Sequence, residues 1–179
     1  MRLKLERCER GHRVPFFIPS IRMHNSDLVK LIEKGLSELE FTDTYLIDTK
    51  VNSNKIEIFL DCDTGIDFLK CQKLSRWLEA IFDESKPYGE SYTLEVSSPG
   101  VGSPLKLLRQ YPKNIGRIID IKYGDGLNIK GTLKDVQNNI IFVEHEVKFK
   151  EGKKNKKEIV IEPIKFEDII ESKVKISFN

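Results

Sequence analysis

The sequence predicts an α+β fold in two small domains, the first mixing helices and strands and the second built from strands. Three observations carry this prediction. Helix and strand periodicities alternate up to about residue 97, five short strand patterns with close turns follow from residue 117, and the net charge changes sign between the halves. At 179 residues the chain is long enough for two modest hydrophobic cores.

Residues 25–97 follow the pattern helix, hairpin, helix, strand. Ser26 is the expected N-cap of the first helix, whose apolar face comprises Leu28, Leu31, Ile32, Leu36 and Leu39. The remaining elements are expected as strands at 45–51 and 55–61, a helix at 67–84 and a strand at 92–96. We therefore expect an α/β domain with its helices on one face of a small sheet.

Residues 117–179 carry short alternating patterns separated by turn residues. The five strands are expected at 117–123, 129–136, 140–148, 158–163 and 172–178. A single helical turn is expected between Pro163 and Ile170, before the last strand. Short strands without a long helix are typical of a small β-barrel, and this arrangement suits an SH3-like barrel.

Residues 98–116 form the junction between the two domains. A strand ends at Val96, the hydroxyls of Ser97 and Ser98 can bond nearby backbone, and Pro99-Gly100 predicts a turn. Ser103 is expected to cap a short helix with Pro104 at its first position. No acid occurs between Glu95 and Asp120, whereas four cations do: Lys106, Arg109, Lys113 and Arg117. A helical path would align the first three of them on one face.

Residues 1–24 have no clear period and contain Pro15 and Pro19. We expect an N-terminal extension that can be disordered, although its apolar stretch 14–18 could cover part of a core. Met23 is the only methionine after Met1, and the first helical pattern begins just beyond it. We therefore hypothesise that Met23 is the natural start and that residues 1–22 are an upstream extension.

Charge divides the chain into an acidic part and a basic part. Residues 25–91 hold eight Lys and Arg against fourteen acids, a net charge of −6, and residues 92–179 hold sixteen against twelve, a net charge of +4. Two surfaces with different partners are therefore expected, and the basic one favours nucleic acid through phosphate contacts.

The densest basic cluster lies in residues 148–157, and its lysines are Lys148, Lys150, Lys153, Lys154, Lys156 and Lys157. Gly152 and Asn155 within it suggest a mobile hairpin tip. Two interpretations stay open for this segment. It is either a solubilising loop or a finger whose lysines contact RNA phosphates.

Several classes of protein are disfavoured by what the sequence lacks. No apolar run reaches the roughly 20 residues of a membrane helix, and the N-terminus lacks the apolar core of a secretory signal. The three cysteines are odd in number and irregularly spaced, which indicates reduced thiols in a cytoplasmic protein. The histidines are isolated and no phosphate-binding loop is present, so we expect no metal, no cofactor and no enzyme.

The segment Asp61-Cys62-Asp63-Thr64-Gly65 invites a catalytic interpretation, because paired carboxylates after a strand serve metal-dependent phosphatases. The threonine falls one position early for the D-x-D-x-T pattern of those enzymes. Asp63-Thr64-Gly65 also matches an aspartic-protease triplet, but the second such motif that the chemistry needs is missing. We expect an acidic turn at this position, not a catalytic site.

The most specific stretch is Leu94–Gly100, which reads L-E-V-S-S-P-G and is followed by Pro104-Leu105 and Gly116. In these residues the chain resembles the RimP family of ribosome maturation factors. Leu74-Ser75-Arg76 and Phe82-Asp83 also match the family pattern, and the resemblance covers about residues 26–178. The family's common Asp-Arg before Pro-Leu is here Gly102-Ser103, so no contact of that arginine is carried over.

The resemblance implies a KH-like α/β domain followed by an SH3-like barrel, in a monomeric protein without catalytic chemistry. It implies a role in assembling the small (30S) ribosomal subunit. The implied partners are the immature subunit, a small-subunit ribosomal protein near the decoding centre and ribosomal RNA, with no membrane. Candidate contact residues are the junction motif Ser97–Gly100 and the basic residues Arg76, Lys106, Arg109, Lys113, Arg117, Lys153, Lys154, Lys156 and Lys157.

Two alternatives to an assembly factor stay open. A general RNA-binding module that acts in translation or RNA turnover could use the same pair of domains, because a fold does not determine a function. A metal-dependent phosphatase would rest on Asp61 and Asp63 alone.

Overall fold

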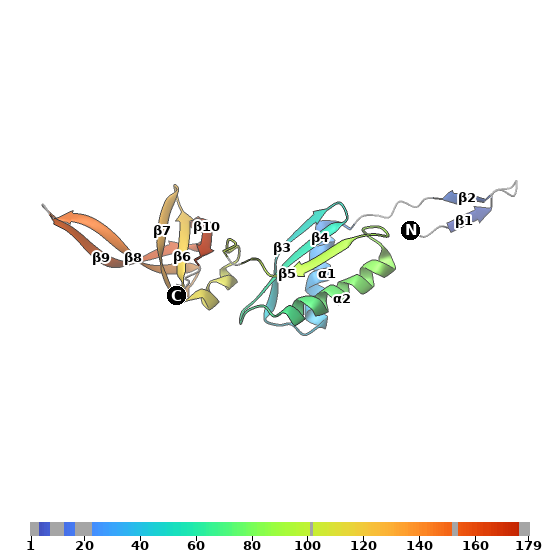
Figure 1. Ribbon diagram of the computed structural model, residues 1–179, viewed down its shortest axis with the longest axis horizontal. Coiled ribbons are helices and arrows are strands. Elements are labelled where there is room, and N and C mark those ends of the chain that lie inside the picture. The colour runs from blue at the N-terminus through green and yellow to red at the C-terminus, as the bar shows by residue number, and fades with distance from the viewer. Residues whose placement is uncertain (1–3, 8–12, 17–22, 101, 152–153, 176–179) are drawn as a thin grey trace. The chain divides into compact units, whose positions relative to one another are not determined.

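The computed structural model describes residues 4–7, 13–16, 23–100, 102–151 and 154–175, and the chain divides into two compact units (Figure 1). The first unit comprises Met1–Asp61 and Ile66–Ser98, and the second comprises Cys62–Gly65 and Pro99–Asn179. Helices and a three-stranded sheet build the first unit, and a five-stranded sheet builds the second. The predicted α+β class is therefore confirmed.

A short two-stranded sheet lies in the N-terminal segment, where the sequence predicted no element. Strands β1 (Lys4–Arg7) and β2 (Arg13–Phe16) pair antiparallel. All the remaining residues of the proposed extension 1–22, including the end of the apolar stretch 14–18, lie outside the described residues. The proposed start at Met23 stays a prediction.

Helix α1 (Asn25–Glu38) is where the first apolar pattern placed it, but its predicted N-cap is wrong. His24 occupies the cap position with extended backbone, and its carbonyl accepts the amide protons of Asp27 and Leu28 at 3.0 Å each. Ser26 therefore lies inside the first turn. The acidic side chain of Asp27 is still in that turn, where it complements the positive end of the helix dipole.

The sheet of the first unit has the order β3 (Thr44–Asn52), β4 (Lys55–Cys62), β5 (Thr93–Ser97). Strands β4 and β5 are parallel, so the chain needs a crossover between them, and α2 (Phe68–Ser85) provides it. Both helices contribute apolar side chains to one core with the fully buried β4 residues Ile56, Ile58 and Leu60. Among the described residues no helix is long and apolar enough to cross a membrane.

The second unit is a five-stranded antiparallel sheet in the order β10-β6-β7-β8-β9. Its strands are β6 (Ile118–Tyr123), β7 (Leu127–Gln137), β8 (Ile140–Glu151), β9 (Lys154–Lys165) and β10 (Ile169–Val174). The single helical turn predicted before the last strand is present as the 3₁₀ turn η3 (Phe166–Asp168). The lysine-rich segment predicted as a mobile tip is mostly strand, because β8 and β9 pair as far as Glu151 and Lys154.

The short helix predicted to start at Ser103 and Pro104 is wrong. Pro104 forms an isolated bridge with Lys173, and the amide of Leu105 donates to the Ser172 carbonyl at 2.9 Å, so this stretch extends along β10. Two 3₁₀ turns follow, η1 (Leu108–Gln110) and η2 (Pro112–Asn114). The side-chain carbonyl of Gln110 accepts the amide protons of Lys106 and Leu107, which stabilises this turn in place of a helix.

A buried pair of hydroxyls joins the segment before β6 to the last strand. Tyr111 and Ser172 are both fully buried, and their hydroxyl oxygens are hydrogen-bonded to each other. The Tyr111 ring also packs edge-on against Phe166, with 5.9 Å between ring centroids. Burial raises the pKa of Tyr111, so the phenol stays protonated and able to donate.

We predict that Tyr111→Phe destabilises the second unit by about 1–3 kcal/mol, because the Ser172 hydroxyl is left buried without its partner. Ser172→Ala should cost a similar amount. The double variant should lose less than the sum of the two, since it leaves no orphaned hydroxyl. Urea unfolding of the four proteins, followed by circular dichroism, measures this coupling, and strictly additive losses would contradict it.

Gly131 in β7 lies where two strands approach closely. A Cβ atom built on it would clash with the backbone oxygen of Glu144 in β8. A backbone oxygen in a paired strand has little freedom to move aside. The position therefore requires glycine, because no side chain fits there. Gly131 pairs with Ile119 of β6, and its neighbour Thr132 pairs with Glu144 of β8.

We predict that Gly131→Ala lowers the free energy of unfolding of the second unit by about 2–3 kcal/mol through overpacking. Gly100→Ala is the matched control, because a Cβ there would meet no atom closer than 3.8 Å. The single tryptophan, Trp77, lies in the first unit, so its fluorescence should follow that unit while circular dichroism follows both. Equal urea midpoints for the two variants would refute the prediction.

Candidate functional site

The predicted basic contacts of the second unit fall into two clusters at opposite ends of that unit (Figure 1). The first, which we call the pre-sheet cluster, comprises Lys106, Arg109, Lys113 and Arg117. The second, the ribbon tip, lies where β8 meets β9 and carries the lysines from Lys148 to Lys157. Arg76 is exposed on α2 in the first unit and belongs to neither cluster.

The pre-sheet cluster is already engaged with protein groups. The Arg109 guanidinium donates from Nε and Nη2 to the two carboxylate oxygens of Asp63, at 2.8 and 2.6 Å. Lys113 Nζ donates to the Cys62 carbonyl at 2.9 Å, and Arg117 donates to the side-chain oxygen of Asn114 at 3.0 Å.

The predicted helical alignment of Lys106, Arg109 and Lys113 is wrong, because the chain is extended at Lys106 and turns twice after it. Their charges therefore do not form one stripe. The Arg109 charge is directed to a carboxylate of the same chain, which leaves a smaller positive field at this cluster than the sequence suggests.

The acidic turn after β4 has a structural partner in Arg109. A bidentate arginine–carboxylate pair occupies both oxygens of Asp63, the second carboxylate of the Asp61–Gly65 segment. Within the described residues, no group of three or more His, Cys, Asp or Glu side chains could hold a metal ion. In this turn, Asp63 therefore has a structural role as the partner of Arg109.

The two described cysteines, Cys62 in β4 and Cys71 in α2, are buried and form no disulfide with each other. Burial raises the pKa of Cys71, and the nearby charge of Asp67 raises it further. A thiol with a raised pKa is a weak nucleophile at neutral pH because the thiolate is the reactive form. Cys71 thus behaves as a core residue.

The junction motif lies where the chain leaves the first unit. Ser97 is the last residue of β5 and pairs with Phe59 of β4, while the boundary between the units falls between Ser98 and Pro99. Ser97, Ser98 and Gly100 are exposed. The Gly100 carbonyl accepts the Ser103 amide at 2.9 Å, so the turn begins at Gly100, one residue later than Pro99-Gly100 predicts.

The ribbon tip is the part of the β8–β9 hairpin that extends past its neighbouring strand. Strand β7 pairs with β8 only as far as Glu144, whereas β8 and β9 continue to pair up to Glu151 and Lys154 (Figure 1). Lys148 lies opposite Lys157, and Lys156 lies opposite Phe149. Lys156 and Lys157 are exposed, and the side chains of Lys153 and Lys154 lie outside the described residues.

Exposed apolar side chains mark surfaces that the sequence did not single out. On β9, Ile159 is 71% exposed and Ile161 is 56% exposed, and β9 is the last strand of the sheet. On the first turn of α2, Phe68 and Leu69 are also exposed. The sequence did contain a signal for the exposed β9 residues. In a strand with one solvent-exposed face, apolar and polar residues alternate, whereas Ile159-Val160-Ile161 is an unbroken apolar run.

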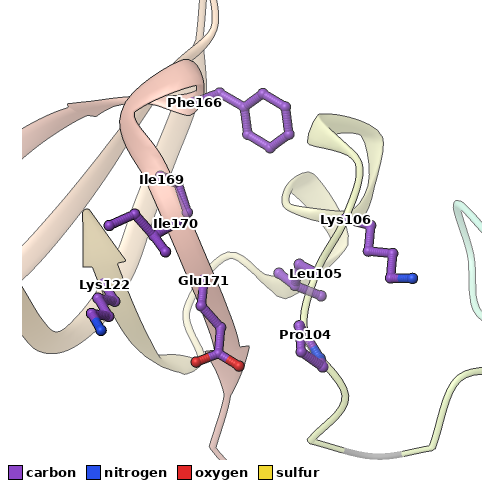
Figure 2. Close-up of a pocket in the computed structure, with 8 residues that line it drawn as sticks. All are labelled: Pro104, Leu105, Lys106, Lys122, Phe166, Ile169, Ile170 and Glu171. Atoms are coloured by element: carbon purple, nitrogen blue, oxygen red, sulfur yellow. The ribbon is translucent and has the colours of Figure 1, made fainter. Parts of the chain in front are cut away.

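A pocket of about 490 Å³ lies between the extended segment before η1 and strand β10 (Figure 2). Figure 2 shows Leu105 pointing toward β10 and Lys106 pointing away from it. The other apolar lining comes from Pro104, Phe166, Ile169 and Ile170, and Lys122 and Glu171 complete it. The pocket forms because residues 104–106 run along β10. The sequence predicted a helix for these residues and therefore did not predict the pocket.

Comparison with known proteins agrees with this geometry. Residues 33–102, which span most of the first unit and the junction motif, match the family model of the RimP N-terminal domain. The chain is 34% identical over 168 residues to the ribosome maturation factor RimP of Cytophaga hutchinsonii, an alignment that covers 89% of this chain and 96% of that protein.

Two further relatives carry the same name. The ribosome maturation factor RimP of Flavobacterium psychrophilum is 41% identical over 116 residues, covering 64% of this chain and 71% of that protein. That of Christiangramia forsetii is 37% identical over 154 residues, covering 83% and 95%. The agreement over both units, and not the junction motif alone, shows that the chain belongs to the RimP family of ribosome maturation factors.

Proposed function

We propose that this protein acts in maturation of the small (30S) ribosomal subunit by binding the immature particle, a small-subunit ribosomal protein and ribosomal RNA. Its relatives are named ribosome maturation factors, which supports the coarse role. It acts as a monomer in the cytoplasm, where subunits assemble, and contributes binding without catalysis. The observation that carries the finer proposal is the β8–β9 hairpin, which combines an open strand edge with a lysine-rich tip.

The two units fit the two domain types of this proposal. We assign residues 25–97 to a KH-like α/β domain and residues 117–179 to an SH3-like barrel, joined by 98–116, with 1–24 as an extension. Two helices on a three-stranded sheet support the first assignment. Five short antiparallel strands around one apolar core, with a 3₁₀ turn before the last, support the second.

The edge of β9 is the proposed contact for the ribosomal protein. An edge strand presents unpaired backbone groups, and an extended segment can add to it as a further strand. Ile159 and Ile161 point to one face of this edge, while Glu158 and Glu162 point to the other, because side chains alternate along a strand. An extended segment with apolar residues on one face and cations on the other would complement both the isoleucines and the glutamates of β9.

The ribbon tip is the proposed contact for ribosomal RNA. Lysines there would bind phosphates as point charges, and the pre-sheet cluster would add phosphate contacts at the other end of the unit. Arg109, Lys113 and Arg117 already donate hydrogen bonds within the chain, so phosphate would compete with these partners for the same donors. Arg76 and the exposed serines of the junction motif remain proposed contacts on the first unit and its boundary.

We predict that the purified protein co-sediments with immature small subunits in preference to mature subunits, by about tenfold or more in affinity, or roughly 1.4 kcal/mol. Free ribosomal RNA of the same sequence should compete weakly, because the assembly factor contacts protein as well as RNA. Equal retention on mature subunits would contradict the proposal. Tighter binding to free RNA than to either particle would favour a general RNA-binding module.

We predict that Ile159→Lys weakens binding to the immature subunit by about 1–3 kcal/mol, because a cation on the edge of β9 opposes a basic, partly apolar segment. The change should leave the free energy of unfolding within about 0.5 kcal/mol, since the side chain is largely exposed. Leu127→Lys is the matched control, with 60% exposure at the start of β7. The edge assignment fails if both variants bind alike.

A further inference from the structure

Strand β10 is an edge strand of the five-stranded sheet, and its outer edge is only partly covered. Strand β6 pairs with it on one side. On the other side residues 104–106 run along it, and the Leu105 amide donates to the Ser172 carbonyl at 2.9 Å. The segment then turns away into η1. The stretch Ile169–Glu171 therefore faces the pocket of Figure 2, and no strand of the described part of the chain pairs with it there.

One residue of this stretch lies outside the regular pairing. Ile169 and Glu171 each have a partner residue in β6, whereas the register passes over Ile170. The Ile170 side chain is 60% exposed and lines the pocket, together with Leu105 from the facing wall and Phe166 from η3 (Figure 2). Bulges at sheet edges redirect side chains in this way. The result is an apolar pocket of about 490 Å³ beside an open strand edge, a volume within the roughly 300–1,000 Å³ of ligand sites.

The charges at this pocket favour an acidic occupant. Lys122 and Glu171 lie opposite each other on β6 and β10, but the Glu171 carboxylate binds Lys173 at 2.6 Å. Lys122 is exposed, and its ammonium forms no ion pair within the part of the chain that the structure describes. Lys106 also lines the pocket, although its side chain points away from β10 (Figure 2). A carboxylate beside Lys122 is therefore attracted, whereas a cation there is repelled.

We propose that the pocket beside β10 docks a short, acidic, extended segment of a protein partner. The segment pairs with the open edge at Ile169–Glu171, seats a bulky apolar side chain between Leu105 and Phe166, and places a carboxylate beside Lys122. Residues 104–106 already show how an extended chain lies against this edge, and they limit the added pairing to the stretch before Ser172. Because so short a pairing contributes little affinity, the apolar side chain is the main anchor.

This partner differs from the cationic segment proposed for β9, so the two edges of the sheet take segments of opposite charge. The walls of the pocket favour a protein segment over nucleic acid, because five of the eight residues that line it are apolar. Interfaces with nucleic acid are more polar and more strongly cationic. A phosphate backbone would use Lys122 but leave the apolar walls and the strand edge unused, whereas an extended peptide uses all three.

The experiment uses the full chain and four fluorescein-labelled heptapeptides, measured by fluorescence polarisation. The central residue is Phe or Ala, the flanking residues are Glu or Lys, and threonine fills the other positions. The wild type should bind the Phe peptide with Glu flanks roughly fivefold more tightly than the one with Lys flanks, and added salt should reduce this difference. The Ala peptides should bind roughly tenfold more weakly or less. Equal binding of all four peptides, or no binding of the Phe peptide with Glu flanks, would overturn the proposal.

Three variants separate the pocket from the rest of the surface. Ile170→Ser should weaken binding of the Phe peptide with Glu flanks by roughly tenfold. Ile161→Ser on β9 is the matched control, because that side chain is 56% exposed on the opposite edge strand, and it should bind like the wild type. Lys122→Glu should reverse the preference from Glu to Lys flanks, a result that a loss of folding cannot produce. Circular dichroism of each variant checks the fold.

Two further measurements test the strand pairing and the occupant. Peptides N-methylated at one or the other set of alternate amides should differ, because only one set faces β10, and equal binding by both would refute the pairing. In amide NMR spectra the peptide should shift residues 104–106 and 166–171, and shifts confined to β9 would refute the site. Tighter binding of a single-stranded RNA oligonucleotide that Ile170→Ser abolishes would assign the pocket to nucleic acid instead. A dimer in sedimentation that Ile170→Ser dissociates would make the occupant a second copy of this chain and also refute the proposal.

Discussion

Strand β8 is twelve residues long, but β7 pairs with it only as far as Glu144, and most of the second unit's surface chemistry depends on this difference. The inner half of β8 contributes Ile141 and Val143 to the core, whereas the outer half has β9 as its single strand partner among the described residues. A two-stranded ribbon has no interior, so Val147 and Phe149 stay exposed although they continue the core stripe.

Buried polar contacts hold the other end of the second unit together. Tyr111 and Ser172 are 61 positions apart, and their buried hydroxyls join the segment before β6 to the last strand. Leu105 adds a backbone hydrogen bond to Ser172, and the resulting extended stretch forms one wall of the pocket beside β10. These contacts stabilise that end of the sheet through buried polar pairs.

The two basic clusters differ in the partners of their cations. In the pre-sheet cluster, Arg109 pairs with Asp63 and Lys113 with a backbone carbonyl, so these residues contribute to structure within the chain. At the tip, Lys148 lies opposite Lys157, and Lys157 forms an ion pair with Glu146 at 3.0 Å.

The sequence by itself determined the α+β class, the succession of helices and strands from residue 25 onward and the RimP family, because these depend on local periodicity and on the contiguous motif Leu94–Gly100. It predicted Ser26 as a cap and a helix after Ser103, and both are wrong. Backbone partners distant in sequence, such as Ser172 for Leu105, decide how that second segment folds.

Only the tertiary structure decided which side chains stay exposed and which charges are paired. Arg109 and Asp63 are 46 positions apart, and no local pattern predicts their bidentate contact. Phe149 and Ile159 read as core residues in any strand pattern, and they are exposed because β7 ends its pairing with β8 at Glu144 and, in the described part of the chain, no other strand continues beside the hairpin. Exposure depends on how far neighbouring strands run alongside each other, which is a property of the register and not of either strand's own sequence.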